Sequence, residues 1–411
     1  MTGRYRWVIL AAGTLSQSSF SAVSVGLPAL APALRSHYRL SLGQTGVVLG
    51  SCGIGMLLTL LPWGLLADRI GERAVIALGL SGAGAAIAAT SATRSYPALV
   101  GLLILTGALG ASVNAASGRA VMGWFGVEER GLALGIRQSA IPIGGAVAAA
   151  ALPWLASAGG TGRAFEALGA GLVGGALVAV VFMREAPVVE RHAAADLRPP
   201  LRDLRMWLLA GGSSLYLTAQ IATMTFVVLF LHEHRGLSAH AAAAVLAGTN
   251  VLGIGARIGA GRWSDRVRTR IAPLRLVGTV LAAGMLVVAA LVDAPLAVLV
   301  PVLIVAGVLG LAWNGLAFTA AAERAGAARS GAALGFQQTM LGVLGAALPP
   351  AFAVFVSATS WRIAFAVSAA GPALGVLLLR RVPESSGLTG DVRRAPGSRS
   401  RGVLPRPQSR R

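Results

Sequence analysis

Lysine is missing from this 411-residue chain, cysteine occurs once, and 15 acidic residues stand against 35 basic ones, all of them arginine. Without lysine the chain has no G-x-x-x-x-G-K-S/T loop to cradle nucleotide phosphates, so ATP-driven pumping is disfavoured. Cys52 stands alone within an apolar run, which excludes a disulfide framework or a thiolate metal cluster built from this chain.

Histidines are also few, and all five fall in predicted loops or at predicted helix ends: His37, His192, His232, His234 and His240. Three of them, with Glu233, lie close together in sequence and could hold a metal. Solvated loop residues explain them better, because no second layer of supporting polar partners is apparent. We therefore expect no metal, no cofactor and no enzymatic activity, since an enzyme needs acids, histidines or metal ligands that converge.

Charge is scarce overall. Only 12% of residues are charged, 55% are hydrophobic and the mean hydropathy is +0.72, whereas soluble domains carry about 25% charged residues. Lipid must therefore solvate much of the surface. The net charge of +20 would suit a nucleic-acid partner. Most arginines, however, gather in segments that would share one side of a membrane, which is the positive-inside pattern. We expect membrane lipid and no nucleic acid as a partner.

Twelve apolar segments reach the roughly 20 residues that a helix needs to cross a bilayer. They are residues 7–30, 44–66, 74–93, 97–122, 132–155, 164–183, 207–231, 239–261, 273–293, 295–321, 332–356 and 361–380. The arginine bias places both chain termini in the cytoplasm of a multi-pass protein in the cytoplasmic (inner) membrane.

The segments divide into two sets of six. Residues 1–183 form a first bundle, a polar linker covers 184–205, a second bundle covers 206–381, and 382–411 form a flexible basic cytoplasmic tail. Residues 133–138 (ALGIRQ) match 333–338 (ALGFQQ) at an offset of 200, and Leu40-Ser41 matches Leu237-Ser238 at 197. The predicted fold is an all-α membrane protein with twelve transmembrane helices in two pseudo-symmetric six-helix bundles.

A charged hairpin ends the second apolar segment of each half. The first copy is residues 64–73 (GLLADRIGER) and the second is residues 261–268 (GRWSDRVR). The spacing G-x-x-x-D-R-x-G-x-R resembles the loop between helices two and three of the major facilitator superfamily of transporters, and the resemblance extends over about residues 5–381. The second copy has Arg268 where the first has Gly71.

This resemblance implies a conformational gate that closes the cytoplasmic side and biases the protein toward an outward-facing state. Its residues would be Gly64, Asp68, Arg69, Gly71, Arg73, Gly261, Asp265 and Arg266. The expected partner of Asp68 is the start of the eleventh helix near Gly331, where the helix dipole is positive. The alternative is a plain loop whose arginines only set the orientation.

Three arginines fall within predicted spans: Arg119, Arg137 and Arg257. No acidic residue is predicted at the same depth, so we expect them to bind an anionic substrate, which a guanidinium grips through two hydrogen bonds. Arg257 also resembles an arginine in the eighth helix of the organic-anion and monocarboxylate branches. The alternatives are exposure to the cytosol or an ion pair with Glu128, Glu129 or Glu323.

Polar and aromatic residues on the first, fourth, seventh and tenth spans are further candidates for substrate binding, because those helices line the central cavity in the family. They are Gln17, Asn114, Tyr216, Gln220, Trp313 and Asn314. The alternative is that the amides join neighbouring helices by hydrogen bonds.

The combined prediction is a secondary active transporter, acting as a monomer, that moves a small organic solute by alternating access. The solute would be an anion such as a carboxylate, and a proton or ion would drive its movement. A drug or secondary-metabolite efflux pump is the first alternative. The antiporter run G-x-x-x-G-P-x-x-G-G is poorly matched, since Ile141 precedes Pro142. A membrane sensor or enzyme is the second alternative.

Overall fold

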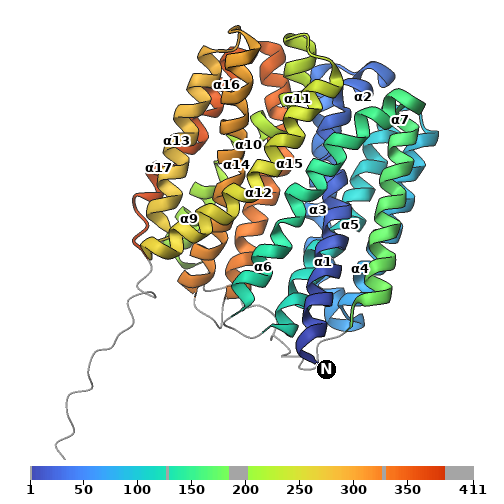
Figure 1. The fold of residues 1–411 in the computed structure, drawn as a ribbon, viewed down its shortest axis with the longest axis vertical. Coiled ribbons are helices and arrows are strands. Elements are labelled where there is room, and N and C mark those ends of the chain that lie inside the picture. The colour runs from blue at the N-terminus through green and yellow to red at the C-terminus, as the bar shows by residue number, and fades with distance from the viewer. Residues whose placement is uncertain (1, 126–128, 185–201, 326–329, 385–411) are drawn as a thin grey trace, which may run out of the picture.

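The computed structural model describes residues 2–125, 129–184, 202–325 and 330–384. Most of the predicted linker and tail, together with Glu128, lies outside these residues. The described chain consists of helices joined by short loops (Figure 1). Its first bundle contains α1 (Thr2–Ser24), η1 (Leu27–Leu30), α2 (Ala31–Tyr38), α3 (Leu42–Ile70), α4 (Glu72–Ala89), η2 (Thr90–Ala92), α5 (Tyr96–Trp124), α6 (Arg130–Gln138) and α7 (Ala140–Phe182).

The second bundle begins after the linker and repeats this plan. It contains α9 (Leu204–Ser214), α10 (Leu217–Met224), α11 (Val227–Leu229), the π-helical turn η3 (Phe230–His234), α12 (Ala239–Val267), α13 (Ile271–Ala290), α14 (Leu296–Ala325), α15 (Ser330–Ala358), α16 (Trp361–Ser368) and α17 (Ala370–Leu379).

Eleven segments of the described chain are long and apolar enough to cross a membrane. The longest, Leu132–Phe182, counts twice because its helix folds back at Gly159 and Gly160, where Gly160 has φ 75°. Only glycine adopts this backbone region without strain. Twelve spans result, which confirms the predicted fold class. The first predicted span, residues 7–30, lies within the apolar segment Arg4–Tyr38, in which α1 ends at Ser24 and a short 3-10 helix begins at Leu27.

Repeated local sequence accounts for repeated helix starts. The Leu-Ser pair found in both halves supplies the N-cap of α3 and of α12. Ser41 accepts a hydrogen bond from the backbone of Gln44, and Ser238 accepts one from Ala241. A serine hydroxyl at this position satisfies one of the amide groups that a helix start leaves free. The Ser41 cap is completed by the Gln44 side chain, which accepts from the Ser41 backbone.

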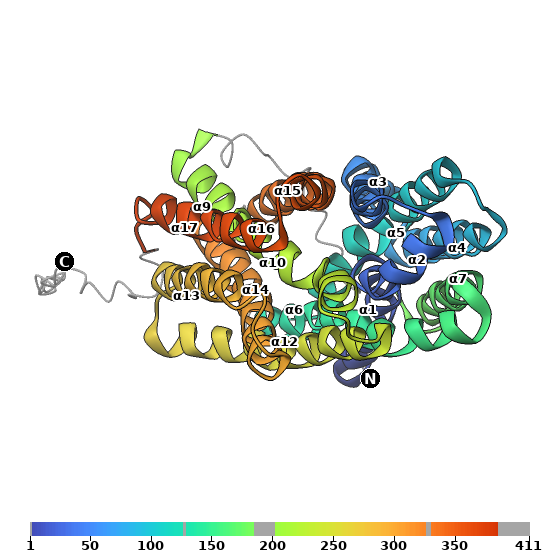
Figure 2. The same cartoon turned by 90° about the horizontal axis from the view of Figure 1, so that it is seen from above.

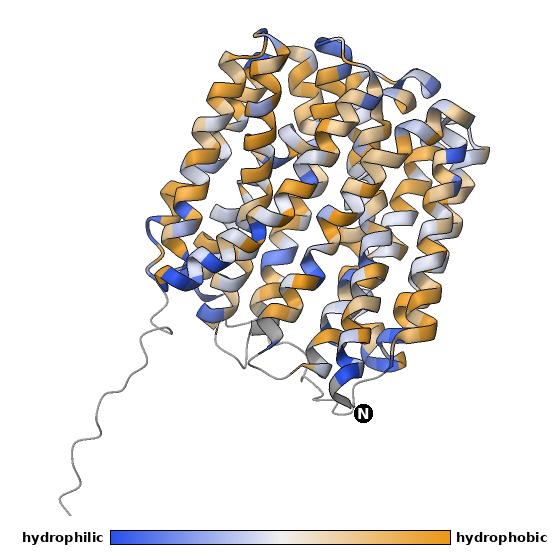
Figure 3. Cartoon of the chain, in the orientation of Figure 1, coloured by the Kyte–Doolittle hydropathy of each residue, from blue (hydrophilic) through white to orange (hydrophobic). Residues whose placement is uncertain are grey.

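Hydrophilic residues gather at the two ends of the molecule, and apolar residues cover most of the length between them (Figure 3). We call the end with the starts of α1 and α9 the terminal end, and the opposite one the far end. Large apolar side chains are exposed along the outside, for example Leu58 at 67% and Val181 at 63%. Such a surface requires lipid around it.

The two bundles touch mainly through two helix pairs, α3 with α15 and α7 with α12 (Figure 2). Small residues allow the close approach. A β-carbon added to Gly46 would lie 2.5 Å from Cβ of Ala353 and 2.7 Å from the Pro349 carbonyl oxygen, and one added to Gly50 would lie 3.3 Å from the Ala346 oxygen. These contacts belong to the half of each helix nearer the far end.

Packing between the bundles thins toward the terminal end. Gly64 on α3, Gly335 on α15 and both Gly259 and Gly261 on α12 have no neighbouring atom within 4 Å of an added β-carbon. In this conformation the bundles are thus closed together at the far end and separated along these helices at the terminal end. This differs from the conformation that the gate prediction implied, in which the terminal end would be shut.

The close packing at Gly46 predicts a steric effect. Gly46→Leu should destabilise this conformation by about 1–3 kcal/mol, as overpacking of a tight contact does, and lower the melting temperature of the purified protein. Gly171→Leu is the matched control, because Gly171 is exposed and an added β-carbon there meets nothing within 4 Å. Equal melting temperatures for the two variants would contradict the closed far end.

Candidate functional site

Arg119 is not the unpaired cation that the sequence predicted. Its Nη1 donates to Oδ1 of Asp68 at 2.5 Å and its Nη2 donates to Oε1 of Glu72 at 3.0 Å. The prediction was wrong because α5 runs beside α3, so an arginine near the end of α5 reaches the charged hairpin after α3. Two carboxylates satisfy this guanidinium, and we remove Arg119 from the candidate substrate residues.

Arg137 is buried, with 7% of its surface exposed, and all its described partners are neutral. Its Nε donates to Oγ of Ser117 at 2.8 Å, Nη2 donates to Oε1 of Gln17 at 3.0 Å, and Nη1 donates to Oε1 of Gln138 at 3.2 Å. Burying an ion costs free energy unless it is paired. Hydrogen bonds to neutral oxygens offset part of that cost but leave the charge in place.

Arg257 lies where the two bundles meet. Its Nε donates to the Leu311 carbonyl oxygen at 2.9 Å within the second bundle, and its Nη1 donates to the Gln138 carbonyl oxygen of the first bundle at 3.3 Å. Its Nη2 has no hydrogen-bond partner among the described residues. It is also not fully buried, because it is absent from the set of buried polar atoms that lack a partner. This nitrogen therefore retains some solvent-accessible surface.

The ion pairs proposed as alternatives for Arg257 do not form in the described chain. Glu129 is paired with Arg6 at 2.5 Å, and Glu323 is paired with Arg270 at 2.8 Å. Glu128 lies outside the described residues. Arg137 and Arg257 thus keep two positive charges inside the molecule, with neutral oxygens as their described hydrogen-bond partners.

The candidate amides form one pair in each bundle. Gln17 Nε2 donates to Asn114 Oδ1 at 3.0 Å, and Asn314 Nδ2 donates to Gln220 Oε1 at 3.2 Å. Asn114, Gln220 and Asn314 are partly exposed, whereas Gln17 is buried and also binds Arg137. The amides therefore join helices, as the alternative expected, and three of them retain accessible surface.

Tyr216 lies one turn before Gln220 and Trp313 directly before Asn314, but both aromatic side chains belong to the apolar core of the second bundle. Both side chains are 0% exposed and pack edge to face, with ring centroids 5.6 Å apart. The Tyr216 hydroxyl donates to the Leu274 carbonyl oxygen at 3.1 Å. In this conformation they belong to the core of the second bundle and do not line an accessible site.

The first charged hairpin is held within its own bundle. Asp68 pairs with Arg119, and not with the start of α15 near Gly331 as predicted. Arg69 and Arg73 are exposed. Gly71 joins α3 to α4 with φ 83°, a conformation that glycine adopts without steric cost. In this conformation the hairpin does not close the terminal end.

In the second hairpin the positions of one acid and its arginine are exchanged: the hairpin carries the arginine, and the neighbouring helix carries the acid. Arg270, beyond the predicted motif, donates to Asp265 at 2.5 Å and to Glu323 of α14 at 2.8 Å. The first hairpin instead carries the acid, Glu72, and its helix partner carries Arg119. Gly261 is partly exposed, and Asp265 and Arg266 are exposed. Sequence reasoning missed Glu72 and Arg270, although the repeat offset of about 198 brings Glu72 onto Arg270, and it named Glu323 only as a partner for the arginines within the spans.

Arg270 lies between α12 and α13, outside the spanning segments. Burial lowers the pKa of Arg270, and hydrogen bonds to Glu323 and Asp265 outweigh this effect, so its pKa is raised. The guanidinium therefore stays charged at any physiological pH.

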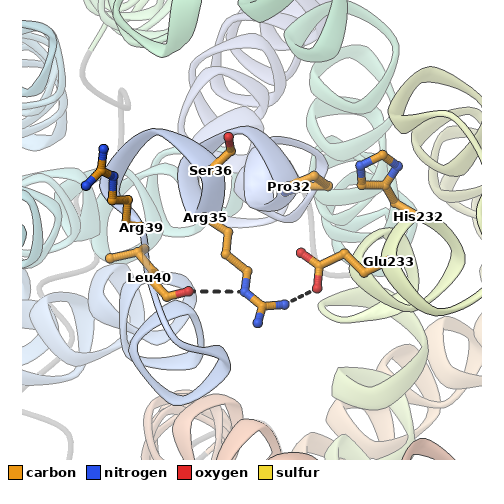
Figure 4. A pocket seen from close by; sticks show the side chains of 7 residues that line it. All are labelled: Pro32, Arg35, Ser36, Arg39, Leu40, His232 and Glu233. Atoms are coloured by element: carbon orange, nitrogen blue, oxygen red, sulfur yellow. Dashed lines mark hydrogen bonds and ion pairs between the residues drawn. The ribbon is translucent and has the colours of Figure 1, made fainter.

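The far end holds an open hollow of about 510 Å³ between the bundles (Figure 4). Arg35 of α2 reaches across it to Glu233 of η3 in an ion pair, and its Nε donates to the Leu40 carbonyl oxygen at 3.1 Å. Pro32, Ser36, Arg39 and His232 complete the lining. The hollow lies at the end opposite the two charged hairpins, and the Arg35–Glu233 pair is one of the contacts that close the far end.

The two bundles of apolar spans define a helical membrane protein with cations in its interior. The family model of the Major Facilitator Superfamily matches residues 10–350. An uncharacterized MFS-type transporter of Mycobacterium tuberculosis is 33% identical over 379 residues, 91% of this chain and 84% of the relative. The chain belongs to the major facilitator superfamily and is a multi-pass membrane transporter.

Other comparisons agree with this family. The probable sulfoacetate transporter SauU of Cupriavidus necator is 28% identical over 281 residues, 64% of this chain and 65% of the relative. A bacterial homolog of the human lysosomal transporter Spinster, in an inward-facing and unoccupied conformation, gives a TM-score of 0.74 at 16% identity, covering 94% of this chain and 96% of that one. The proton:xylose symporter XylE gives 0.69 at 15%, covering 94% and 98%. These structures share the fold.

The reversed polarity of the hairpins predicts a rescue. Arg270→Glu should destabilise the protein by about 2 kcal/mol, because it removes charged hydrogen bonds and brings three carboxylates together. Adding Glu323→Arg should recover at least half of the loss in a thermal melt, because the first bundle is stable with that polarity. Arg266→Glu, at an exposed position, is the control and should change the melt little. A double variant less stable than Arg270→Glu would contradict the pairing.

Proposed function

We propose that this transporter moves a small organic anion, such as a carboxylate, across the cytoplasmic membrane by alternating access. A proton or ion gradient would drive the movement. The observation that carries the proposal is the pair of guanidiniums, Arg137 and Arg257, contributed by different bundles and hydrogen-bonded in the described chain to neutral oxygens.

An anion would relieve the main electrostatic cost of this arrangement. Isolated charges in an apolar interior are unfavourable, and membrane proteins keep them where they face a partner, water or a ligand. Arg257 has an accessible Nη2, so a carboxylate can receive hydrogen bonds from it without displacing the bond to Leu311. Asn114, Gln220 and Asn314 are partly exposed and would hydrogen-bond the remainder of the solute.

The name of one relative supports an anionic cargo. SauU is named as a probable sulfoacetate transporter, and sulfoacetate is a small organic anion. Efflux of drugs or secondary metabolites is the alternative, and no contact in the described structure favours it.

The proposed orientation follows from the arginines. Placing the terminal end in the cytoplasm puts the charged hairpins, linker and tail on the inner side. The conformation is then inward-facing, closed at the far end by the α3–α15 contact and the Arg35–Glu233 pair. Gly64, Asp68, Arg69, Gly71, Arg73, Gly261, Asp265 and Arg266 would act as a gate by closing the terminal end in the opposite conformation.

Arg257→Gln should weaken the binding of carboxylates to the purified protein by at least about 30-fold, since losing one member of a buried charge pair costs 2 kcal/mol or more. Arg257→Lys should retain part of the affinity, because it keeps the charge and loses the planar fork. Thermal shift against a panel of carboxylates, sulfonates and neutral solutes measures this, and uptake into proteoliposomes follows the solutes that bind.

Arg119→Gln is the matched control, because Arg119 has the same side chain but is already neutralised by Asp68 and Glu72. Its anion affinity should stay near that of the wild type. Equal loss of affinity in both variants, or selective binding of neutral solutes, would contradict an anionic cargo. Proteoliposomes are loaded with the solute on one side of the membrane and an ion gradient is imposed. The direction in which the solute then moves distinguishes uptake from efflux.

A further inference from the structure

We propose that the cargo is a dianion, a small molecule with two acidic groups, and that Arg137 is the residue that selects the second charge. This inference rests on the proposed function and narrows it from anions in general to one charge class. It comes from the position of Arg137 relative to Arg257 and from the distribution of carboxylates around them.

The two guanidiniums meet at a single residue. Arg137 Nη1 donates to the side-chain Oε1 of Gln138 at 3.2 Å, and Arg257 Nη1 donates to the backbone oxygen of the same residue at 3.3 Å. One charge belongs to the first bundle and the other to the second. Their separation is therefore limited to the reach across one glutamine plus two hydrogen bonds, a span that a small molecule with two acidic ends can match.

The nearby carboxylates of the described chain are committed elsewhere. Asp68 and Glu72 bind Arg119, Glu129 binds Arg6, and Glu323 binds Arg270. The site around Gln138 thus holds two positive charges without a described carboxylate to neutralise them. A monoanion would leave one of these charges uncompensated, whereas a dianion would neutralise both, and both bundles would then attract the same ligand.

The two arginines differ in how they act. Arg257 has an accessible Nη2 and touches the ligand directly. Arg137 is almost fully buried, and each of its three nitrogens already donates to a neutral oxygen. Arg137 is therefore a positioning residue. It orients Gln17 and Gln138 and supplies a field that favours a second negative charge.

The second repeat shows that an amide can occupy the position of Arg137. At the offset of 200, Arg137 corresponds to Gln337 and Gln138 to Gln338. Gln337 is buried and donates from Nε2 to Oγ of Ser213 at 3.0 Å, much as Arg137 donates to Oγ of Ser117. Arg137→Gln therefore removes the charge while keeping a donor that the surrounding helices can accommodate.

The test compares two probes with one skeleton, succinate and monomethyl succinate, which differ by one negative charge. Binding to the purified full chain is measured by calorimetry at constant ionic strength, for the wild type and for Arg137→Gln. The wild type should bind succinate at least about tenfold more tightly than the monoester, as expected for one additional charge interaction in a partly buried site. In Arg137→Gln this ratio should fall toward one, chiefly through weaker succinate binding.

Each outcome separates the two proposals. If the wild type binds the monoester as tightly as succinate, the dianion inference is wrong while anion transport stands. If the wild type binds neither probe nor any other anion of the panel, the proposed function fails as well. An unchanged ratio in a folded Arg137→Gln variant overturns the role of Arg137. Should that variant fail to fold, the wild-type ratio, repeated with malonate and monomethyl malonate, still decides the charge class.

Discussion

A guanidinium inside an apolar bundle must find either a counter-charge or a set of hydrogen-bond acceptors, and this constraint governs the interior of the protein. Arg119 meets Asp68 and Glu72 and becomes part of an ion-pair cluster at the terminal end. Arg137 is surrounded by hydroxyl and amide oxygens. Arg257 is held by two backbone carbonyl oxygens and keeps an open nitrogen. The three arginines therefore differ in whether their charge is paired, because different side chains and carbonyl groups surround them.

Close packing of small and apolar residues determines where the two bundles touch. Each bundle has its own apolar core, and the core of the first bundle includes Phe226, Leu229 and Ala353 from the second, all near the far end. Small residues such as Gly46 and Gly50 let the helices touch there. Few close contacts join the same helices at the terminal end. Two bundles whose closest contacts lie at one end can rock against each other, which is how a carrier of this family exposes its site alternately.

Much of the architecture could be predicted, because lipid imposes a length and polarity rule on each segment. The twelve spans, the division into two bundles and the repeat all follow from apolar length and spacing. Pairing of charges was harder to predict. Arg119 and Glu72 are far apart in the chain, and their contact requires α3, α4 and α5 to pack together. The repeat offset could have pointed to Glu72 and Arg270, but not to their opposite roles.

The sequence by itself determined that this chain is a helical membrane protein with two related halves, since hydrophobic length and arginine bias act locally along the chain. Only the tertiary structure decided which buried charges remain available. Packing brings Asp68 to Arg119 and leaves Arg137 and Arg257 on either side of Gln138. Ion pairing depends on distances of a few ångströms between segments remote in sequence, and no local pattern encodes those distances.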